Sequence, residues 1–210
     1  MGVNSPRGSV REDRGRPTVL EGGEFPNPDS APVDGRIRID IGAGHFRQKG
    51  WVSVDLYEGS SQGKPDVVSD IRKLPFPDDY ADEARAIHVI EHFYAWEALE
   101  VMQEWVRILK PGGQLAIECP SLEKIIKLAD IPQIEPRYTY WALYGDPRHR
   151  RPEMCHRWCY TTLALVRLMT QAGLDNLVPE KPQFHFPVRD MRVVGTKPSG
   201  GQRIVLPGDK

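Results

Sequence analysis

The sequence has few cysteines, no long apolar run and no excess of charge of either sign. Its three cysteines, Cys119, Cys155 and Cys159, are too few and too unevenly spaced for a disulfide framework, so we expect a reducing compartment, the cytoplasm. No run approaches the roughly 18 apolar residues of a membrane span, and no signal peptide is recognisable, so membrane insertion is not expected. With a net charge of -1, the chain has no overall positive potential that would attract a polyanion, so no nucleic-acid partner is expected.

The two ends of the chain differ from its middle in composition. Residues 1–34 are rich in Gly, Pro and charge and lack a periodic apolar face, which predicts a disordered tail. Residues 197–210 are broken by Pro and Gly and predict a looser C-terminal tail. The chain of 210 residues is long enough to bury one full core, so residues 35–196 are predicted to form one domain.

Between the tails, strand patterns alternate with helix patterns. The predicted strands are 36–41, 51–56, 66–69, 84–90 and 114–119, followed by a terminal pair at 174–178 and 191–196. The predicted helices are 95–110, ended by Pro111 and two glycines, 121–130 and 162–172. Such alternation predicts an α/β sheet with helices on both faces. Residues 131–160 are aromatic-rich and fit neither period, which favours a lid or substrate loop.

A glycine turn follows the first predicted strand, in the sequence Asp40-Ile41-Gly42-Ala43-Gly44. Glycines let backbone approach a ligand closely, and Asp55, at the end of the second strand, is placed to accept hydrogen bonds from ribose hydroxyls. A simple turn is the alternative. A dinucleotide-binding turn would need a third glycine where Arg47 stands, and only ten residues separate Gly44 from Asp55, so a nicotinamide enzyme is disfavoured.

Further segments extend this pattern along the chain: RIDIGAGHF, WVSVDL, VVSDIRKLPFPDDYADE, IHVIEH and EWVRILKPGGQLAIECPS. Together they resemble the class I S-adenosylmethionine-dependent methyltransferases, in particular the small methyltransferases of bacterial lipopolysaccharide and surface-polysaccharide gene clusters. The resemblance covers residues 36–196. It implies a seven-stranded, mostly parallel Rossmann-like sheet with an antiparallel C-terminal strand and a shortened first crossover. It also implies S-adenosylmethionine as the cofactor.

The resemblance also implies positions for the cofactor. By this resemblance, the glycine turn would pass under the methionine part of the cofactor and Asp55 would hold its ribose. Asp70 and Ile71 would bracket its adenine. The backbone after the fourth strand lines the methyl-transfer pocket. The cofactor-binding residues implied in this way are Asp40, Gly42, Ala43, Gly44, Asp55, Leu56, Asp70, Ile71 and His88.

Two short patterns resemble metal motifs. The stretch His88-Val89-Ile90-Glu91-His92 has the spacing of an inverted zinc-protease motif, which requires both histidines on one helical face. The apolar alternation before it places His88 at a strand end instead. The second pattern, from Cys155 to Cys159 with His149 nearby, lacks a second ligand pair at a usual spacing. We therefore expect no metal site.

Methyl transfer to a hydroxyl needs a group that removes the proton. His156 is the first candidate base, because the segment from His156 to Thr161 resembles the histidine-bearing segment that these enzymes often carry ahead of their last helix. A structural histidine is the alternative, and His88, Glu91 and Glu118 are weaker candidates. In the same region, Arg148, Arg150 and Arg151 concentrate positive charge that would suit an anionic substrate or a plain solvated loop.

These patterns predict a methyltransferase whose acceptor is a hydroxyl or amine of a small molecule or glycan, with a sugar of surface-polysaccharide biosynthesis as the expected acceptor. The chain has no Asn-Pro-Pro-Tyr or Asp-Pro-Pro-Tyr segment, which by the same resemblance argues against methylation of DNA bases. The alternative from another class is a non-catalytic cofactor-binding or scaffold protein that keeps the fold.

Overall fold

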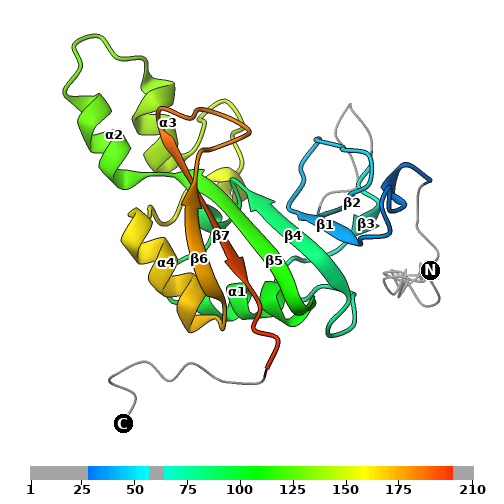
Figure 1. The fold of residues 1–210 in the computed structure, drawn as a ribbon. Helices are drawn as coiled ribbons and strands as arrows, with labels where there is room; N and C mark the ends of the chain where they lie inside the picture. Colours follow the sequence, from blue (N-terminus) through cyan, green and yellow to red (C-terminus); the bar gives the residue numbers. More distant parts are fainter. Residues whose placement is uncertain (1–27, 57–63, 201–210) are drawn as a thin grey trace, which may run out of the picture.

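The structure, a computed structural model, describes residues 28–56 and 64–200 of the chain and contains one mixed sheet (Figure 1). Its seven described strands run in the order β3-β2-β1-β4-β5-β7-β6. The first five are parallel, and β7 is antiparallel to both β5 and β6. The predicted α/β fold with an antiparallel C-terminal strand is therefore confirmed. The strands are β1 (Arg38–Ile41), β2 (Val52–Asp55), β3 (Val67–Val68), β4 (Ala81–Ile87), β5 (Leu109–Pro120), β6 (Asp175–Glu180) and β7 (Asp190–Thr196).

The first crossover, from β1 to β2, is short. Residues 42–51 form turns and contain no helix, as the ten-residue spacing requires. Gly42 and Ala43 each donate a backbone hydrogen bond to the Val54 carbonyl, at 2.9 and 3.1 Å. The crossover therefore stays against the carboxyl end of β2.

Four α-helices are described: α1 (Ala98–Arg107), α2 (Leu122–Ala129), α3 (Tyr140–Tyr144) and α4 (Thr162–Gln171). Short 3-10 turns lie at Pro28–Ser30, Ile90–His92, Pro136–Tyr138 and Pro152–Met154. The Ser121 and Thr161 side chains accept hydrogen bonds from backbone amides in the first turns of α2 and α4, which stabilises those helix starts. Helices α2 and α3 lie beyond the end of the sheet at which β5 finishes (Figure 1). None of the described helices is long and apolar enough to span a membrane.

The hydrophobic core lies on one face of the sheet. Helices α1 and α4 contact each other and pack against β5, β6 and β7, so they share that face. The largest buried side chain, Trp105 of α1, donates its indole N–H to the Ile71 carbonyl at 2.9 Å, which satisfies its polar group. The other core side chains include Ile39, Ile41, Val54, Ala84, Ala86, Leu115, Ile117, Val193, Met102, Leu165 and Met169.

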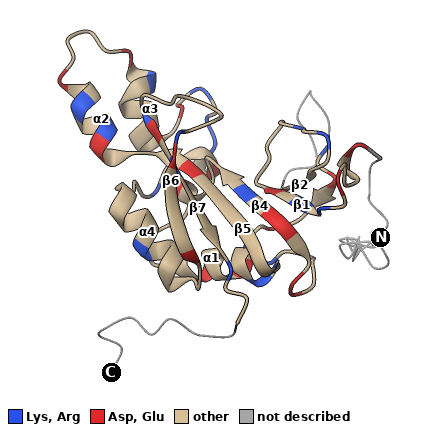
Figure 2. Cartoon of the chain, in the orientation of Figure 1, with Lys and Arg blue, Asp and Glu red and all other residues tan. Residues whose placement is uncertain are grey.

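The opposite face of the same strands is polar. Its buried side chains are Asp40 of β1, Ser53 of β2, Arg85 of β4 and Glu118 of β5. Figure 2 shows charged residues within the strands of the sheet, and not only on helices and loops. The second layer of helices predicted from the alternation is not seen among the described residues. The reason is local, because the first crossover is too short to hold a helix and the alternating strands bury polar side chains on this face.

Several boundaries differ from those predicted. β4 spans Ala81–Ile87 rather than 84–90, and α1 ends at Arg107 rather than Lys110. Strand β5 already begins at Leu109, because Leu109 pairs with Ala81 of β4 before the chain reaches Pro111. The tertiary pairing therefore overrides the helical period at this point.

The described structure also begins before residue 35 and continues past residue 196. The Asp29 carbonyl accepts a hydrogen bond from the Gly50 amide at 2.7 Å, and Ser30 is buried. At the other end, Lys197 donates its backbone amide to Gly113 and its side chain to Asp79. The remaining parts of the predicted tails, 1–27 and 201–210, lie outside the described residues.

Candidate active site

A cavity of about 940 Å³ opens at the carboxyl ends of β1 and β4. Open α/β sheets bind ligands at this edge, and the volume falls in the range of small-molecule sites. Among the residues predicted from the sequence, the cavity is lined by Asp40, Gly42, Ala43, Gly44, His88 and His156. Residues of the segment predicted as a lid, including Trp141 and Met154, form part of its wall.

A further part of the wall, at 184–186 and Arg189, was missed by the sequence analysis. The available signal was the run Gln183-Phe184-His185-Phe186, which alternates aromatic rings with a histidine just before the last strand. Buried carboxylates hold this segment. Glu118 accepts the backbone amides of Gln183 and Phe184 at 2.9 and 3.0 Å, so its carboxylate is occupied and cannot serve as the base.

The glycine turn forms the floor of one end of the cavity. Gly42 and Gly44 have φ of 68° and 55°, in the left-handed region that favours glycine. A Cβ on Gly42 would lie 2.7 Å from Cγ2 of Val89, whereas a Cβ on Gly44 would meet no atom within 4 Å. The Gly44 amide donates to the Asp55 carboxylate at 2.8 Å, which links the turn to the tip of β2.

The other cofactor residues implied by the resemblance do not line the cavity. Asp70 is bound by the Arg72 side chain, whose hydrogen bonds lower the pKa of Asp70. The Ile71 carbonyl accepts the Trp105 indole N–H, and Leu56 is 51% exposed. The structure therefore brings the glycine turn and Asp55 together, and places Asp70 and Ile71 on the loop after β3.

An ion pair beneath the glycine turn was not predicted from the sequence. Arg85 of β4 contacts Asp40 of β1 at 2.5 Å, and both side chains are almost completely buried. The guanidinium lies 4.0 Å from the ring centre of Trp51 and 4.8 Å from that of Phe184, within the range of cation–π contacts. Burial raises the pKa of Asp40, while Arg85 opposes that shift. The predicted cofactor residue Asp40 thus already has a charged partner.

His88 stands between two buried carboxylates, directly after the end of β4. Its Nδ1 lies 2.9 Å from Oε1 of Glu91, and its Nε2 lies 3.0 Å from Oδ2 of Asp190 on β7. Burial alone would lower the pKa of His88, but the two carboxylates raise it to about 9. Both ring nitrogens are therefore occupied on a protonated ring, which excludes His88 as a general base.

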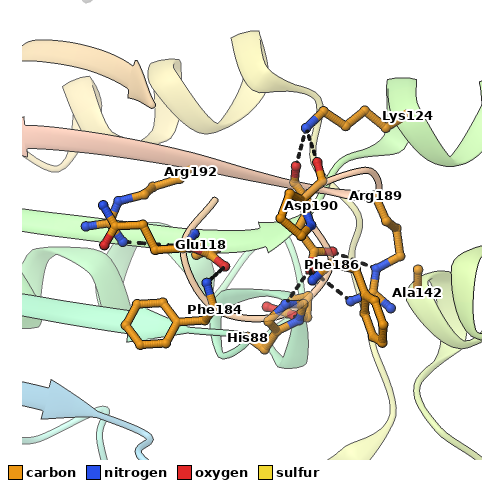
Figure 3. Close-up of polar contacts among 12 residues, drawn as sticks. His88, Glu118, Lys124, Ala142, Phe184, Phe186, Arg189, Asp190 and Arg192 are labelled. Atoms are coloured by element: carbon orange, nitrogen blue, oxygen red, sulfur yellow. Dashed lines mark hydrogen bonds and ion pairs between the residues drawn. The ribbon is translucent and has the colours of Figure 1, made fainter. Parts of the chain in front are cut away.

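Asp190 organises the wall that faces His88. It accepts the Phe186 amide at 3.0 Å and the Arg189 guanidinium at 2.6 Å (Figure 3). Burial would raise the pKa of Asp190, but its bonds to His88 and Arg189 lower it to about 2. The carboxylate is therefore ionised, and it fixes the loop that precedes β7.

The His156 segment docks on the turn that follows His88. The Glu91 carbonyl accepts the amides of Arg157 and Trp158, at 2.7 and 3.2 Å, and the Arg157 side chain donates to the His92 carbonyl. The ring of His156 then lies 4.9 Å from that of His92, edge to face. Folding thus joins the two histidine motifs that the sequence analysis considered separately.

His156 presents one ring nitrogen for chemistry. Its Nδ1 lies 2.8 Å from the Ala142 carbonyl, which fixes Nδ1 as the donor and leaves Nε2 with a lone pair. Burial lowers the pKa of His156, which keeps the ring neutral near pH 7. A neutral imidazole on the cavity wall can accept a proton or bind a cation.

Two arginines of the lid are held in ion pairs. Arg148 lies 2.5 Å from Asp146, and Arg137 lies 2.6 Å from Glu135. Arg148 also lies over the Trp141 ring, at 4.6 Å from its centre. The two arginines line the cavity as parts of these ion pairs.

Residues 49–117 match the model of a family described as a methyltransferase domain. This stretch runs from the end of the first crossover through β2, β4 and α1 into β5. Comparison with curated proteins gives no match.

Solved structures share the fold. A S-adenosylmethionine-dependent methyltransferase from Methanosarcina mazei has a TM-score of 0.55 at 17% identity, over 78% of this chain and 92% of that one. One from Thermotoga maritima, described as a possible histamine N-methyltransferase, has a TM-score of 0.53 at 17% identity, and the match covers 79% of this chain and 84% of that one. The 1,6-didemethyltoxoflavin-N1-methyltransferase of Burkholderia thailandensis was solved with 1,6-didemethyltoxoflavin and S-adenosylhomocysteine bound. It has a TM-score of 0.53 at 14% identity, and the match covers 78% of this chain and 71% of that one. The chain therefore has the fold of these methyltransferases.

The domain match and the fold support S-adenosylmethionine as the cofactor. The residues present fit it. Gly42 and Gly44 leave the floor of the cavity without side chains, and a Cβ at Gly42 would displace the buried Val89. The adjoining carboxylate of Asp55 is held at the turn by the Gly44 amide.

We predict that Gly42→Ala destabilises the protein more than Gly44→Ala. Both variants force alanine into the left-handed region, at about 1–2 kcal/mol each. Gly42→Ala adds a clash with Val89, and such overpacking costs about 1–3 kcal/mol more. Chemical denaturation of the two variants beside the wild type measures the difference. Equal losses would show that Val89 moves aside at no cost.

We also predict strong coupling between Asp40 and Arg85. Arg85→Met leaves a buried carboxylate without its partner and is expected to cost about 3–5 kcal/mol. Asp40→Asn in the same background removes that charge, so the double variant should lose less than the two single losses added together. A double-mutant cycle by urea denaturation gives the coupling, and additive losses would contradict it.

Proposed function

We propose that the protein is a S-adenosylmethionine-dependent methyltransferase that acts in the cytoplasm on a hydroxyl or amine of a small molecule or glycan. A sugar of surface-polysaccharide biosynthesis is the proposed acceptor, on the sequence resemblance. One observation carries the proposal: the same cavity is lined by the glycine turn and by the imidazole of His156, whose pKa is lowered by burial. The methyltransferase domain match over 49–117 supports the same reading.

When bound, S-adenosylmethionine supplies a methyl group on a sulfonium, which an acceptor attacks in line. At the glycine turn, the role proposed for the chain is to hold and orient the cofactor. Gly42 and Gly44 allow close approach of the backbone, and Asp55 is proposed to accept hydrogen bonds from the ribose next to the turn. Asp70 and Ile71 are proposed to hold the adenine, and Asp70 would then exchange part of its contact with Arg72.

At the other end, His156 is proposed to take the acceptor's proton. Its Nδ1 is held by the Ala142 carbonyl, so Nε2 is the accepting atom and the ring has a fixed orientation. His88 and Glu118 are occupied by partners, so neither is proposed as the base. His92 lies beside His156 on the cavity wall and is the second candidate.

The aromatic and paired polar side chains of the lid suit a sugar. Trp141 lines the cavity with one ring face against Arg148, and Asp146 and Glu135 lie beside it as ion-pair partners. Aromatic rings with nearby hydrogen-bonding groups match a sugar's apolar face and its hydroxyls. This supports a neutral hydroxyl-bearing acceptor as the first class to test.

We predict that the wild-type protein binds S-adenosylhomocysteine and that Asp55→Ala weakens this binding by about 1.5–3 kcal/mol, the value of hydrogen bonds to a charged group. Isothermal titration calorimetry measures it, with NAD as a ligand that should not bind. Asp55→Asn is the matched control for the turn, because its amide oxygen can still accept the Gly44 amide. An unchanged affinity in folded Asp55→Ala would remove Asp55 from the cofactor site.

We predict that His156→Ala leaves S-adenosylhomocysteine affinity nearly unchanged and lowers methyl transfer by about 10²- to 10⁴-fold, the span for loss of a general base. Transfer is measured with methyl-labelled cofactor against cell-envelope extracts and simple sugars. Label transfer by the wild type is the expected result. Tight cofactor binding with no transfer to any acceptor would favour a non-catalytic binding protein, and wild-type turnover in His156→Ala would exclude His156 as the base.

A further inference from the structure

A buried carboxylate and two imidazoles converge at the acceptor end of the cavity. Glu91, His92 and His156 each offer a donor atom, and the three atoms lie within 4.8 Å of one another. Both histidines line the cavity, so the cluster is open on one side. The proposed function uses His156 and leaves Glu91 and His92 without a role.

Glu91 is the unusual member of this cluster. Its side chain is 2% exposed, and Oε2 of its carboxylate has no hydrogen-bond partner in the described structure. Oε1 lies beside Nδ1 of His88 as an ion pair, which leaves Oε2 with no described contact. A buried carboxylate oxygen without a partner is costly, so it points to a group that completes it.

Each imidazole of the cluster keeps one ring nitrogen with a free lone pair. The Nδ1 atoms of His92 and His156 lie 3.3 and 2.8 Å from the backbone carbonyls of Cys155 and Ala142. Those contacts hold each ring in the tautomer with a lone pair on Nε2. A carbonyl that accepts the second ring N–H is the usual outer partner of a metal-binding histidine.

The spacing is compatible with one ion. Ligands about 2.1 Å from a tetrahedral centre lie about 3.4 Å apart, so donors within 4.8 Å reach it by side-chain shifts of roughly 1 Å. The segment of His156 is tied to the Glu91 carbonyl by the amides of Arg157 and Trp158, which keeps the three side chains close together.

We propose that Glu91, His92 and His156 bind one divalent transition-metal ion, of the zinc or iron(II) type, at the acceptor end of the cavity. Two imidazoles and one carboxylate with an open side form a ligand set typical of catalytic sites for these ions. Taken separately, the two sequence motifs predict no metal, because His88 lies at a strand end and the Cys155–Cys159 pattern lacks a second ligand pair. The structure completes the set by combining the second half of His88–His92 with His156.

Such an ion would change how the acceptor is activated. A hydroxyl bound at the open position would have a lower pKa, because the cation would stabilise the alkoxide, and its proton would pass to solvent water at the open side of the cluster. In the metal-loaded protein, Nε2 of His156 is a ligand and is not the base. The functional consequence rests on the proposed methyltransferase activity, whereas the ion binding itself does not.

The test measures ion binding without any cofactor. Full-length protein, freed of affinity tags and treated with a chelator, is titrated with Zn²⁺ by calorimetry and with Co²⁺ by visible absorption. We expect one saturable site per chain, with Co²⁺ bands of low-symmetry nitrogen and oxygen coordination. His92→Ala and Glu91→Gln should each weaken Zn²⁺ binding by at least about 100-fold, more than the loss of a second-shell partner.

His149→Ala is the matched control. His149 is an exposed histidine on the wall of the same cavity and lies outside the cluster, so its loss should leave Zn²⁺ affinity unchanged. Because buried Glu91→Gln can lose its fold, circular dichroism is measured for each variant, and His92→Ala, whose ring is partly exposed, decides the result if Glu91→Gln unfolds.

Two results would overturn the proposal: no saturable binding of either ion by the wild type, or equal Zn²⁺ affinity in the wild type and folded His92→Ala. S-adenosylhomocysteine binding is measured on the same samples. If it persists when ion binding fails, the metal site is wrong and the proposed function stands. If the cofactor fails to bind and Zn²⁺ binds, the proposed function is wrong and the metal site stands.

Discussion

The buried charges at the carboxyl ends of β4 and β5 must balance, and the rest of the site depends on how they do. Glu91 and Asp190 are both ionised, because their pKa values are lowered, and both side chains are almost completely buried. The protonated ring of His88 bridges them, and Arg189 supplies the second positive charge. Removing one partner of such a set leaves a buried charge uncompensated, which costs far more than the pair itself contributes. The end of β4 is thereby fixed to the start of β7.

This balance also sets the backbone. His88 has φ of 56°, a left-handed conformation that is strained for a histidine and costs on the order of 1–3 kcal/mol. The strand β4 ends at Ile87, and the turn after it places His92 on the cavity wall and Glu91 in the buried interior beside it. The Glu91 carbonyl accepts hydrogen bonds from the amides of Arg157 and Trp158, and these bonds position the neighbouring His156. One bridging imidazolium therefore positions groups from β4, from the lid and from β7.

The local parts of this architecture were predictable, and the long-range parts were not. Asp40 to Gly44 and Asp55 are close in sequence, and glycine has few other reasons to stand twice at a strand end. The alternating pattern of the first and fourth strands indicated a polar face of the sheet. The sequence around Arg85 did not indicate that Asp40 would be its partner. The contact between His88 and Asp190 spans 102 residues, and Arg157 reaches His92 across 65. Such pairs depend on the sheet order, which a single sequence does not encode as a local pattern.

The two ends of the cavity consequently differ in how they are held. The glycine turn depends on backbone geometry and on bonds to Val54 and Asp55 within a dozen residues. The acceptor end depends on side chains from three distant segments that meet through a few hydrogen bonds, so its assembly requires the lid to be in place. Any displacement of residues 131–160 separates His156 from Glu91 and His92 and leaves the turn intact. If the proposed roles hold, cofactor binding at the glycine turn is separable from acceptor chemistry, because only the chemistry at His156 requires the lid to be docked on the turn after His88.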